Sequence, residues 1–218
     1  MALALVTLRS ADMKNQYSPS PHLPQDDAEI DRLLDLVFGI GRRTKTSYRL
    51  REGSRAIDAL SVVIREEGFG IAAAISFWPL QVGDAQTPAL LLGPLAVHPA
   101  RQGRGLGTQV IQFSLVEAKR LEHTLIVLIG DAPFYLKSGF THVPDGQIKM
   151  PGPLDPKRLL FLELRAGALA EAQGLALPPW RWADINALRA ATLHSPKQAR
   201  PQGLARSQKD QARAPPRS

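Results

Sequence analysis

A proline-rich stretch near the N-terminal end precedes a segment with the apolar spacing of an amphipathic helix. Residues 18–24 read Ser-Pro-Ser-Pro-His-Leu-Pro, which excludes a helix or an interior strand because proline has no N–H to donate. From Asp26, apolar residues recur at positions 30, 33, 34 and 37, and acidic residues crowd the first turn. This pattern predicts a helix that ends at Gly39. A second, short helix is predicted at 44–51.

Strand-like patterns follow. Residues 60–65 and 70–78 are apolar runs joined by Glu66-Glu67-Gly68, which predicts an antiparallel hairpin. The run 89–97 is long enough for a central strand, but Gly93-Pro94 lies in its middle. Because a proline nitrogen cannot join the hydrogen-bond ladder, we expect a bulge or a splayed edge there.

Helices and strands alternate in the second half of the chain. Apolar spacing predicts a helix at 106–121, a buried strand at 124–129 and a short helix at 133–137. Together these segments indicate a mixed α/β fold, with a central, mostly antiparallel sheet flanked by helices. The remaining predicted elements are strands at 141–143, 159–164 and around 168–173, and a closing helix at 182–193.

Composition narrows the class of protein. The 218 residues are 44% apolar and 22% charged, as expected for one globular domain. We expect an N-terminal extension at 1–25, a domain at 26–194 with C-terminal additions after about residue 167, and a tail at 195–218. The lack of cysteine excludes disulfides and thiolate metal sites, and no metal site is expected. No stretch reaches the roughly 18 apolar residues of a membrane span, so we expect a cytoplasmic protein without a membrane partner.

The positive charge is concentrated at the C-terminal end. Of the formal +7, residues 195–218 carry +5, from six basic residues against Asp210, which leaves +2 for the rest. This proline-rich tail has no hydrophobic periodicity, so we expect it to be disordered. A solvated tail is the simpler interpretation, and weak attraction to nucleic acid or to an acidic partner is the alternative.

The candidate chemistry lies in Val97-His-Pro-Ala-Arg-Gln-Gly-Arg-Gly-Leu-Gly-Thr108. Here a strand enters a glycine-rich turn that opens a helix, so that free N–H groups point at a ligand such as a pyrophosphate. Side chains of Arg101, Gln102 and Arg104 can add donors. A P-loop would need Gly-Lys-Ser/Thr, and a dinucleotide fingerprint would need G-x-G-x-x-G. The spacing here is G-x-G-x-G, which fits both poorly.

A second motif follows about 28 residues later, where Gly130-Asp-Ala-Pro-Phe-Tyr-Leu-Lys-Ser-Gly-Phe140 places a tyrosine four residues before Gly-Phe. The two motifs in this order resemble the GNAT superfamily of N-acetyltransferases. Segments 93–97 and 41–53 are similar to an uncharacterised bacterial branch of that superfamily. The resemblance covers roughly residues 26 to 180.

The resemblance implies a fold, a cofactor and a set of roles. The cofactor would be acetyl-CoA, and the sheet would be splayed at the strand 89–97 so that the pantetheine arm lies in the gap. The family's acceptor is an amine, and many relatives form homodimers. Tyr135 would be the general acid and would also contact the cofactor. The other implied cofactor-binding residues are Leu95, Ala96 and Val97 beside the pantetheine, Gln102, Gly103, Arg104, Gly105, Leu106, Gly107 and Thr108 around the pyrophosphate, and Asp131.

The role of Tyr135 has an alternative: it could be a core tyrosine with a satisfied hydroxyl. A further catalytic role falls to the N–H of Val97, which could bind the carbonyl oxygen of the thioester. A structural role is expected for His98, and solvated carboxylates are expected at Glu66 and Glu67. Residues 90–95 hold no carboxylate, so the sequence identifies no general base.

Two further groups of residues each have two possible roles. Packing is the expected role of the three tryptophans, Trp78, Trp180 and Trp182, with an acceptor pocket as the alternative. Arg42, Arg43, Lys45 and Arg49 form a basic cluster. We expect these side chains to lie on a solvated helix face, and the alternative is that they attract an anionic acceptor.

The function expected from the resemblance is direct acetyl transfer from acetyl-CoA to a primary amine of a small molecule or a protein. The alternative to an enzyme is a binding protein: a catalytically inactive sensor that binds acyl-CoA. A nucleic-acid-associated protein acting through the basic tail is a third. The sequence does not name the acceptor.

Overall fold

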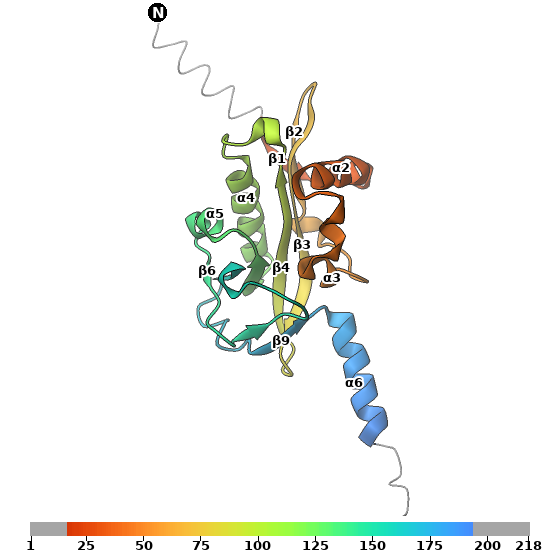
Figure 1. Ribbon diagram of the computed structural model, residues 1–218. Coiled ribbons are helices and arrows are strands. Elements are labelled where there is room, and N and C mark those ends of the chain that lie inside the picture. The colour runs from red at the N-terminus through yellow and green to blue at the C-terminus, as the bar shows by residue number, and fades with distance from the viewer. Residues whose placement is uncertain (1–16, 194–218) are drawn as a thin grey trace, which may run out of the picture.

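The computed structural model describes residues 17–193, and in this range a twisted sheet runs through the middle of the molecule (Figure 1). Its strands follow the order β1-β2-β3-β4-β5-β8-β6, with β9 beside β3 and β7 beside β9. The strands are β1 Pro19–Pro21, β2 Val62–Glu66, β3 Gly70–Val82, β4 Thr87–Val97, β5 Leu125–Ile129, β6 Thr141–His142, β7 Ile148–Lys149, β8 Leu159–Glu163 and β9 Gly174–Leu177.

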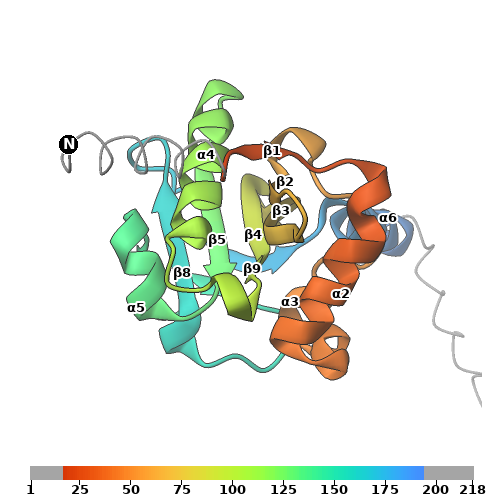
Figure 2. The same cartoon turned by 90° about the horizontal axis from the view of Figure 1, so that it is seen from above.

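Helices cover both faces of this sheet (Figure 2). On one face, α4 buries Leu106, Val110 and Ile111 in a core shared with Phe77. On the other face, α2 buries its apolar stripe against β2 and β3, as its 3.6-residue spacing predicts. The helices are α2 Asp27–Phe38, α3 Thr46–Arg49, α4 Leu106–Arg120, α5 Ala132–Tyr135 and α6 Pro179–Leu193, with short 3₁₀ turns that include η2 Ile40–Thr44 and η4 Pro99–Arg101.

The sheet is mostly antiparallel, as expected from the sequence. Along the main path, β4 and β5 form the parallel pair, and the long α4 crossover joins them, because parallel neighbours cannot be connected by a tight turn. A short parallel pair links β7 and β9 at the margin. The expected mixed α/β class, with helices packed on a central sheet, is therefore confirmed.

The two central strands separate at the Gly93-Pro94 step. Pairing of β4 with β5 covers residues 90–92 against 126–128 and then stops. Beyond that point β4 continues to Val97 beside β3, with a register shift between Ile75 and Phe77. Gly93 has φ +120°, a conformation that favours glycine. The expected splay is confirmed, and the gap between β4 and β5 opens at Gly93.

The N-terminal part of the fold starts earlier than expected. Residues 17–25 were assigned to an extension, but β1 pairs antiparallel with β2 and the Tyr17 side chain is buried in the core. The prolines of this segment exclude an interior strand and allow an edge strand, which is where β1 lies. Residues 1–16 lie outside the described part, as does the predicted basic tail from residue 195.

The expectation of a strand around 168–173 is wrong. This segment consists of turns, because the Glu163 carboxylate accepts hydrogen bonds from the N–H of Gly167 (3.3 Å) and of Leu169 (2.7 Å). The strand β9 begins only at Gly174. The expected helix at 44–51 is shorter as well, with η2 preceding the single turn of α3. Between residues 17 and 193, no helix combines the length and the apolar character that a membrane crossing requires.

Candidate functional site

The glycine-rich loop lies between β4 and α4. Gly103 and Gly105 both have φ +77°, and no atom lies within 4 Å of the position that a Cβ would take on either residue. The N–H of Gln109 bonds the carbonyl of Gly105 at 3.0 Å, so the N–H groups of the three preceding residues make no bond within the helix. The loop therefore presents unpaired backbone donors at the positive end of a helix dipole.

Some side chains beside the loop already donate hydrogen bonds within the protein, and others could donate to a ligand. Arg101 binds Glu66, with Nη2 2.8 Å from Oε1, and its guanidinium lies 3.7 Å from the centre of the Phe69 ring. Arg104 donates to the Tyr17 hydroxyl at 2.6 Å and remains exposed. Gln102 reaches the carbonyl of Val97 at 3.5 Å. Arg104 and Gln102 can thus reach a ligand on the loop, whereas Arg101 holds the loop to the hairpin.

Glu66 corrects the expectation of a solvated carboxylate. Its side chain is only 10% exposed, and the hydrogen bond from Arg101 lowers the pKa of the carboxyl. Its neighbour Glu67 is exposed, as expected. His98 has the expected structural role, because its Nδ1 accepts from the N–H of Ala100 at 3.2 Å and its ring meets Phe69 edge-on at 4.8 Å.

The backbone of β4 faces the gap at the cofactor-binding positions expected from the resemblance. The N–H of His98 donates to the carbonyl of Ala72 at 2.8 Å. Because hydrogen-bonded and non-hydrogen-bonded pairs alternate in an antiparallel ladder, Ala96 also bonds β3. The intervening residues, Leu95 and Val97, direct their N–H and C=O groups to the other side. Those groups line the gap that β5 leaves open.

Gly107 brings three elements together at the end of this gap. A Cβ on Gly107 would lie 3.4 Å from Cγ2 of Val97 and 3.0 Å from Cζ of Phe134. Any larger residue would therefore push α4 away from β4 and α5. Leu106 beside it is fully buried and fixes the first turn of α4 in the core, while Thr108 is partly exposed.

Tyr135 ends α5 on the opposite side of the gap from β3. Its ring contacts Phe134 and Phe140 edge-on, at 4.9 and 5.8 Å between ring centres. Within the described range, its hydroxyl makes no hydrogen bond. Burial raises the pKa of Tyr135 to about 12, against a lowering by the charges of Arg51 and Arg158. The phenol therefore holds its proton at neutral pH.

Asp131 precedes Tyr135 by one helical turn. Its carbonyl accepts the N–H of Phe134 at 3.1 Å, so Asp131 begins α5 while its side chain remains exposed. Its negative charge adds to the raised pKa of Tyr135. The carboxylate thus lies near the tyrosine, at the mouth of the gap.

One wall of the gap was missed by the sequence analysis. Arg51 is 9% exposed, and its guanidinium lies 4.5 Å from the centre of the Tyr48 ring and 5.9 Å from that of Trp78. Trp78 in turn donates its Nε1–H to the carbonyl of Gly93 at 2.8 Å. Burial lowers the pKa of Arg51 to about 10. The segment 41–53 had been singled out for its resemblance, but nothing in its spacing marked Arg51 as the buried member.

The basic cluster is also different from the expected solvated face. Arg42 is 2% exposed and donates to Asp31, Asp35 and Tyr48 at 2.8, 2.7 and 2.9 Å. Burial is the largest single influence on Arg42 and lowers its pKa, but these hydrogen bonds together raise it above the ordinary value. Arg43, Lys45 and Arg49 are exposed, as expected. Arg42 therefore holds α2 and α3 together instead of facing solvent.

The other tryptophans have the packing roles that were expected. Trp182 is buried and donates to the carbonyl of Gln81 at 3.3 Å. Trp180 is 41% exposed and donates to the carbonyl of Glu52 at 2.8 Å. Both therefore fasten α6 to the domain, and Trp78 is the tryptophan that reaches the gap.

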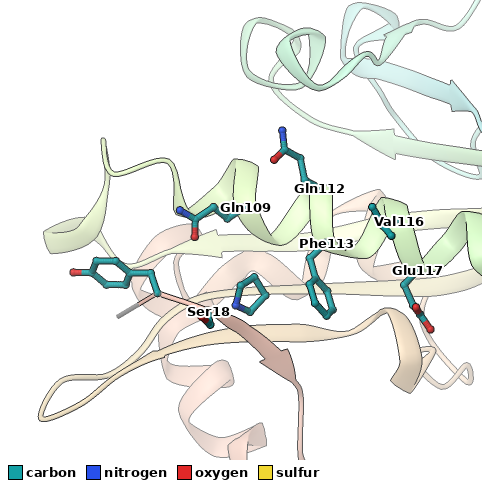
Figure 3. A pocket seen from close by; sticks show the side chains of 8 residues that line it. Ser18, Gln109, Gln112, Phe113, Val116 and Glu117 are labelled. Carbon is teal, nitrogen blue, oxygen red and sulfur yellow. The ribbon is translucent and has the colours of Figure 1, made fainter. Parts of the chain in front are cut away.

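The hollow shown in Figure 3 lies outside the gap, although Tyr17 in its wall accepts a hydrogen bond from Arg104 of the loop. It has a volume of about 530 Å³ and is bounded by the start of β1 and the outer flank of α4. None of its lining residues belongs to the glycine loop or the gap, and Glu117 on its rim is paired with Arg120. In the described part of the chain, no three metal-ligating carboxylates or histidines gather. The candidate site is therefore the gap and not this hollow.

Comparisons with known proteins agree with the geometry. Residues 58–142 match a family model described as an acetyltransferase (GNAT) domain. A curated relative, the uncharacterized N-acetyltransferase YjhQ of Escherichia coli strain K12, is 27% identical over 116 residues. That match spans 53% of this chain and 64% of the relative, slightly less than two thirds of its length.

A solved structure shares the fold. The GNAT family N-acetyltransferase YhbS from Escherichia coli, determined in complex with CoA, superimposes with a TM-score of 0.65 at 22% identity. The superposition covers 77% of this chain and 92% of that one. At this identity the likeness bears on the fold alone. It agrees with the arrangement of sheet and helices described above.

Proposed function

We propose, from the premise that residues 58–142 form a GNAT acetyltransferase domain, that this chain moves an acetyl group from acetyl-CoA to a primary amine of a small molecule or a protein. The observation that carries the proposal is the gap between β4 and β5. It opens at Gly93, with the glycine loop beyond the end of β4 and Tyr135 on the adjoining helix. These three features supply a break in the sheet with unpaired strand backbone, an anion-binding end and a proton donor.

The residues present fit acetyl-CoA. Backbone donors from Gln102 to Thr108 suit a pyrophosphate, because the loop glycines leave the start of α4 open. Arg104 adds a cation beside them. Backbone groups of Leu95 and Val97 would bind the pantetheine amides in the manner of an added strand. Acetyl-CoA supplies the activated acetyl thioester on which the transfer depends.

Tyr135 would manage the proton of the leaving group. During transfer a bond forms between the amine nitrogen and the acetyl carbon, and the bond from that carbon to sulfur breaks. Tyr135 would donate its hydroxyl proton to the leaving sulfur, and solvent would return a proton to the phenolate. The raised pKa of Tyr135, about 12, keeps the phenol protonated until it is needed. The N–H of Val97 would bind the carbonyl oxygen as negative charge develops there.

The proton of the attacking amine needs no fixed base in this proposal. Residues 90–95 of β4 hold no carboxylate, and Glu66 is engaged by Arg101. The amine therefore enters in its neutral form and releases its proton to water during transfer. As a consequence, the rate should rise with pH in step with the neutral fraction of the acceptor.

Calorimetric titration with acetyl-CoA tests the cofactor site. Gly105→Glu should abolish binding, because it places a carboxylate where the pyrophosphate would lie. Gly146→Glu is the matched control: Gly146 also has φ +77° and open space around it, so it carries the same backbone strain and the same charge away from the loop. Binding lost equally in both variants, or in neither, would contradict the proposed site.

A screen of amines with detection of the released thiol tests the transfer itself. Thiol release that depends on both the amine and acetyl-CoA would support the enzyme. Binding of acetyl-CoA without thiol release from any amine would instead favour a sensor that has kept the cofactor site and lost catalysis.

A further inference from the structure

Arg51 is a buried cation that has no counter-ion among the residues that the structure describes. Its Nε and Nη1 atoms are inaccessible to solvent and have no hydrogen-bond partner. No carboxylate between residues 17 and 193 lies within ion-pair distance of it. A buried, unpaired guanidinium destabilises a fold. A role in binding, rather than in holding the domain together, would account for a charge in this position.

Neighbouring charges do not supply the missing partner. Arg42 is the nearby cation whose charge acts on Arg51, and Arg42 already uses Asp31 and Asp35. Tyr48 lies between them: its hydroxyl accepts from Arg42, its ring packs on Arg51, and a hydrogen bond with Tyr48 raises the pKa of Arg51 against the larger effect of burial, while Nε and Nη1 of Arg51 stay unpartnered. Arg42 is thus fully paired, whereas Arg51 keeps free N–H donors. An additional anion would therefore bind to Arg51.

The position of Arg51 places that anion at the reacting end of the gap. Its Nη2 lies 3.5 Å from where a Cβ on Gly93 would stand, at the point where β4 and β5 separate. Its charge also acts on Tyr135, the proposed proton donor. Trp78, which donates to the carbonyl of Gly93, flanks the guanidinium on the other side. Arg51 therefore borders the place where an acceptor amine would have to approach.

The pyrophosphate of the cofactor is not the anion in question. Val97 lies four positions after Gly93 on β4, which corresponds to roughly 13 Å along a strand, and the glycine loop begins only beyond that strand. A phosphate bound at the start of α4 would therefore lie too far from Arg51 to pair with it. With the pyrophosphate excluded, an anion that rests on Arg51 before transfer would belong to the other substrate, since the thiolate forms only during transfer.

We infer that Arg51 binds a carboxylate of the acceptor, so that the substrate is an amine that also carries a carboxylate group, such as an amino acid. This inference rests on the proposed acetyl transfer and specifies its acceptor class. A carboxylate fits better than a phosphate group, because one guanidinium balances one negative charge, whereas a phosphate group carries nearly two. The planar guanidinium also matches a carboxylate in geometry.

The test compares acceptors that share an amine and differ in the anionic group: β-alanine, its carboxamide and 2-aminoethylphosphonate, together with the standard amino acids and their carboxamides. In the wild type, kcat/KM should be roughly ten- to a hundredfold higher for carboxylates than for the matched carboxamides, as expected for a hydrogen-bonded charge pair. Arg51→Met should remove this preference, and Arg51→Lys should keep part of it. Expressing each result as a ratio of wild type to variant cancels the different basicities of the amines.

A second readout does not depend on turnover. With CoA bound, saturating β-alanine should raise the Tm of the wild type and not that of Arg51→Met, and β-alaninamide should raise neither. Without acceptor, Arg51→Met should bind acetyl-CoA normally and unfold at the same or a higher temperature, since an unpaired buried charge has been removed. A variant that is destabilised would show a structural role and overturn the inference.

The outcomes separate the inference from the proposed function. Thiol release with equal preference for carboxylates and carboxamides would overturn the inference and leave acetyl transfer standing. Preference for the phosphonate would overturn the carboxylate assignment. Carboxylate-dependent stabilisation through Arg51, without thiol release from any amine, would support the binding site and contradict the transfer.

Discussion

The ring of Tyr135 occupies the space that a side chain at residue 130 would need. A Cβ on Gly130 would stand 2.8 Å from Cδ2 of that ring and 2.9 Å from Cδ1 of Leu128, closer than packed carbon atoms approach. Gly130 follows the end of β5, and its N–H bonds the carbonyl of Arg158 at 2.9 Å. The glycine therefore fixes where the proposed proton donor stands relative to the gap.

Gly130→Ala should accordingly lower kcat while leaving the affinity for acetyl-CoA nearly unchanged. The added methyl group displaces the Tyr135 ring, and a misplacement of about 1 Å in a reacting group can cost roughly a hundredfold in rate. Steady-state kinetics together with calorimetry would separate the two effects. Gly41→Ala is the control, because no atom lies within 4 Å of its Cβ position. Equal rates in both variants would argue against Tyr135 in the chemistry.

Tyr135→Phe removes the hydroxyl and keeps the ring with its contacts to Phe134 and Phe140. We expect kcat to fall by roughly a hundredfold or more, within the usual contribution of a general acid, with unchanged binding of acetyl-CoA. The fold should be preserved, because the lost hydroxyl has no hydrogen-bond partner among the described residues. A variant with full activity would assign the leaving-group proton to water.

The raised pKa of Tyr135 can be measured with the same variant. The difference in tyrosinate absorbance between the wild type and Tyr135→Phe should titrate near pH 12. A folded-state pKa above the ordinary 10.0 also means that the protonated group favours the fold below about pH 10, and that this stabilisation is lost as the pH rises toward 12. A difference spectrum that titrates near 10 would show a solvated phenol and contradict the burial seen here.

Local patterns were sufficient to predict the parts of the site that depend on backbone geometry. The glycines of the loop and the Gly93-Pro94 step each constrain the chain within a few residues, so the loop at the start of α4 and the separation of β4 from β5 were both expected. The cofactor-binding side chains and Tyr135 remain predictions, since the geometry is compatible with them without testing them.

Long-range contacts account for what the sequence analysis missed. In the sequence, Arg42 and Arg51 are two of several basic residues in one segment. Only the fold brings Asp31 and Asp35 of α2 to Arg42, and Tyr48 and Trp78 to Arg51. The acidic pair at i, i+4 on α2 was a usable signal, because both side chains share a face that a cation could bridge. Burial of Arg51 depends on β3 and β4, which no local pattern reports.

Stability should distinguish two adjacent arginines. Arg42→Ala should lower the free energy of unfolding by about 1–3 kcal/mol, because it removes charge-assisted hydrogen bonds to Asp31, Asp35 and Tyr48 in a buried position. Arg43→Ala should change it by less than about 0.5 kcal/mol, since this side chain is 70% exposed and its pair with Asp31 is a surface pair. Urea denaturation followed by circular dichroism measures both. Equal effects would contradict the burial of Arg42.

The ion pair between Glu66 and Arg101 should make the stability of the protein depend on pH. Arg101 lowers the pKa of Glu66 below its ordinary 4.5, so the folded state binds a proton there less readily than the unfolded state does. The pair therefore stabilises the protein fully above about pH 4.5, and this stabilisation is lost as the pH falls through the lowered pKa.

Glu66→Gln should consequently have a lower Tm than the wild type at pH 7, and the difference should shrink as the pH falls below 4.5 and through the lowered pKa of Glu66. Glu67→Gln is the matched control, because the adjacent Glu67 side chain is exposed and forms no ion pair within residues 17–193; its Tm should follow the wild type at every pH. Since Arg101 lies directly before the glycine loop, Glu66→Gln should also weaken acetyl-CoA binding at neutral pH. A difference in Tm that stays constant with pH would show that Glu66 acts through packing and not through its charge.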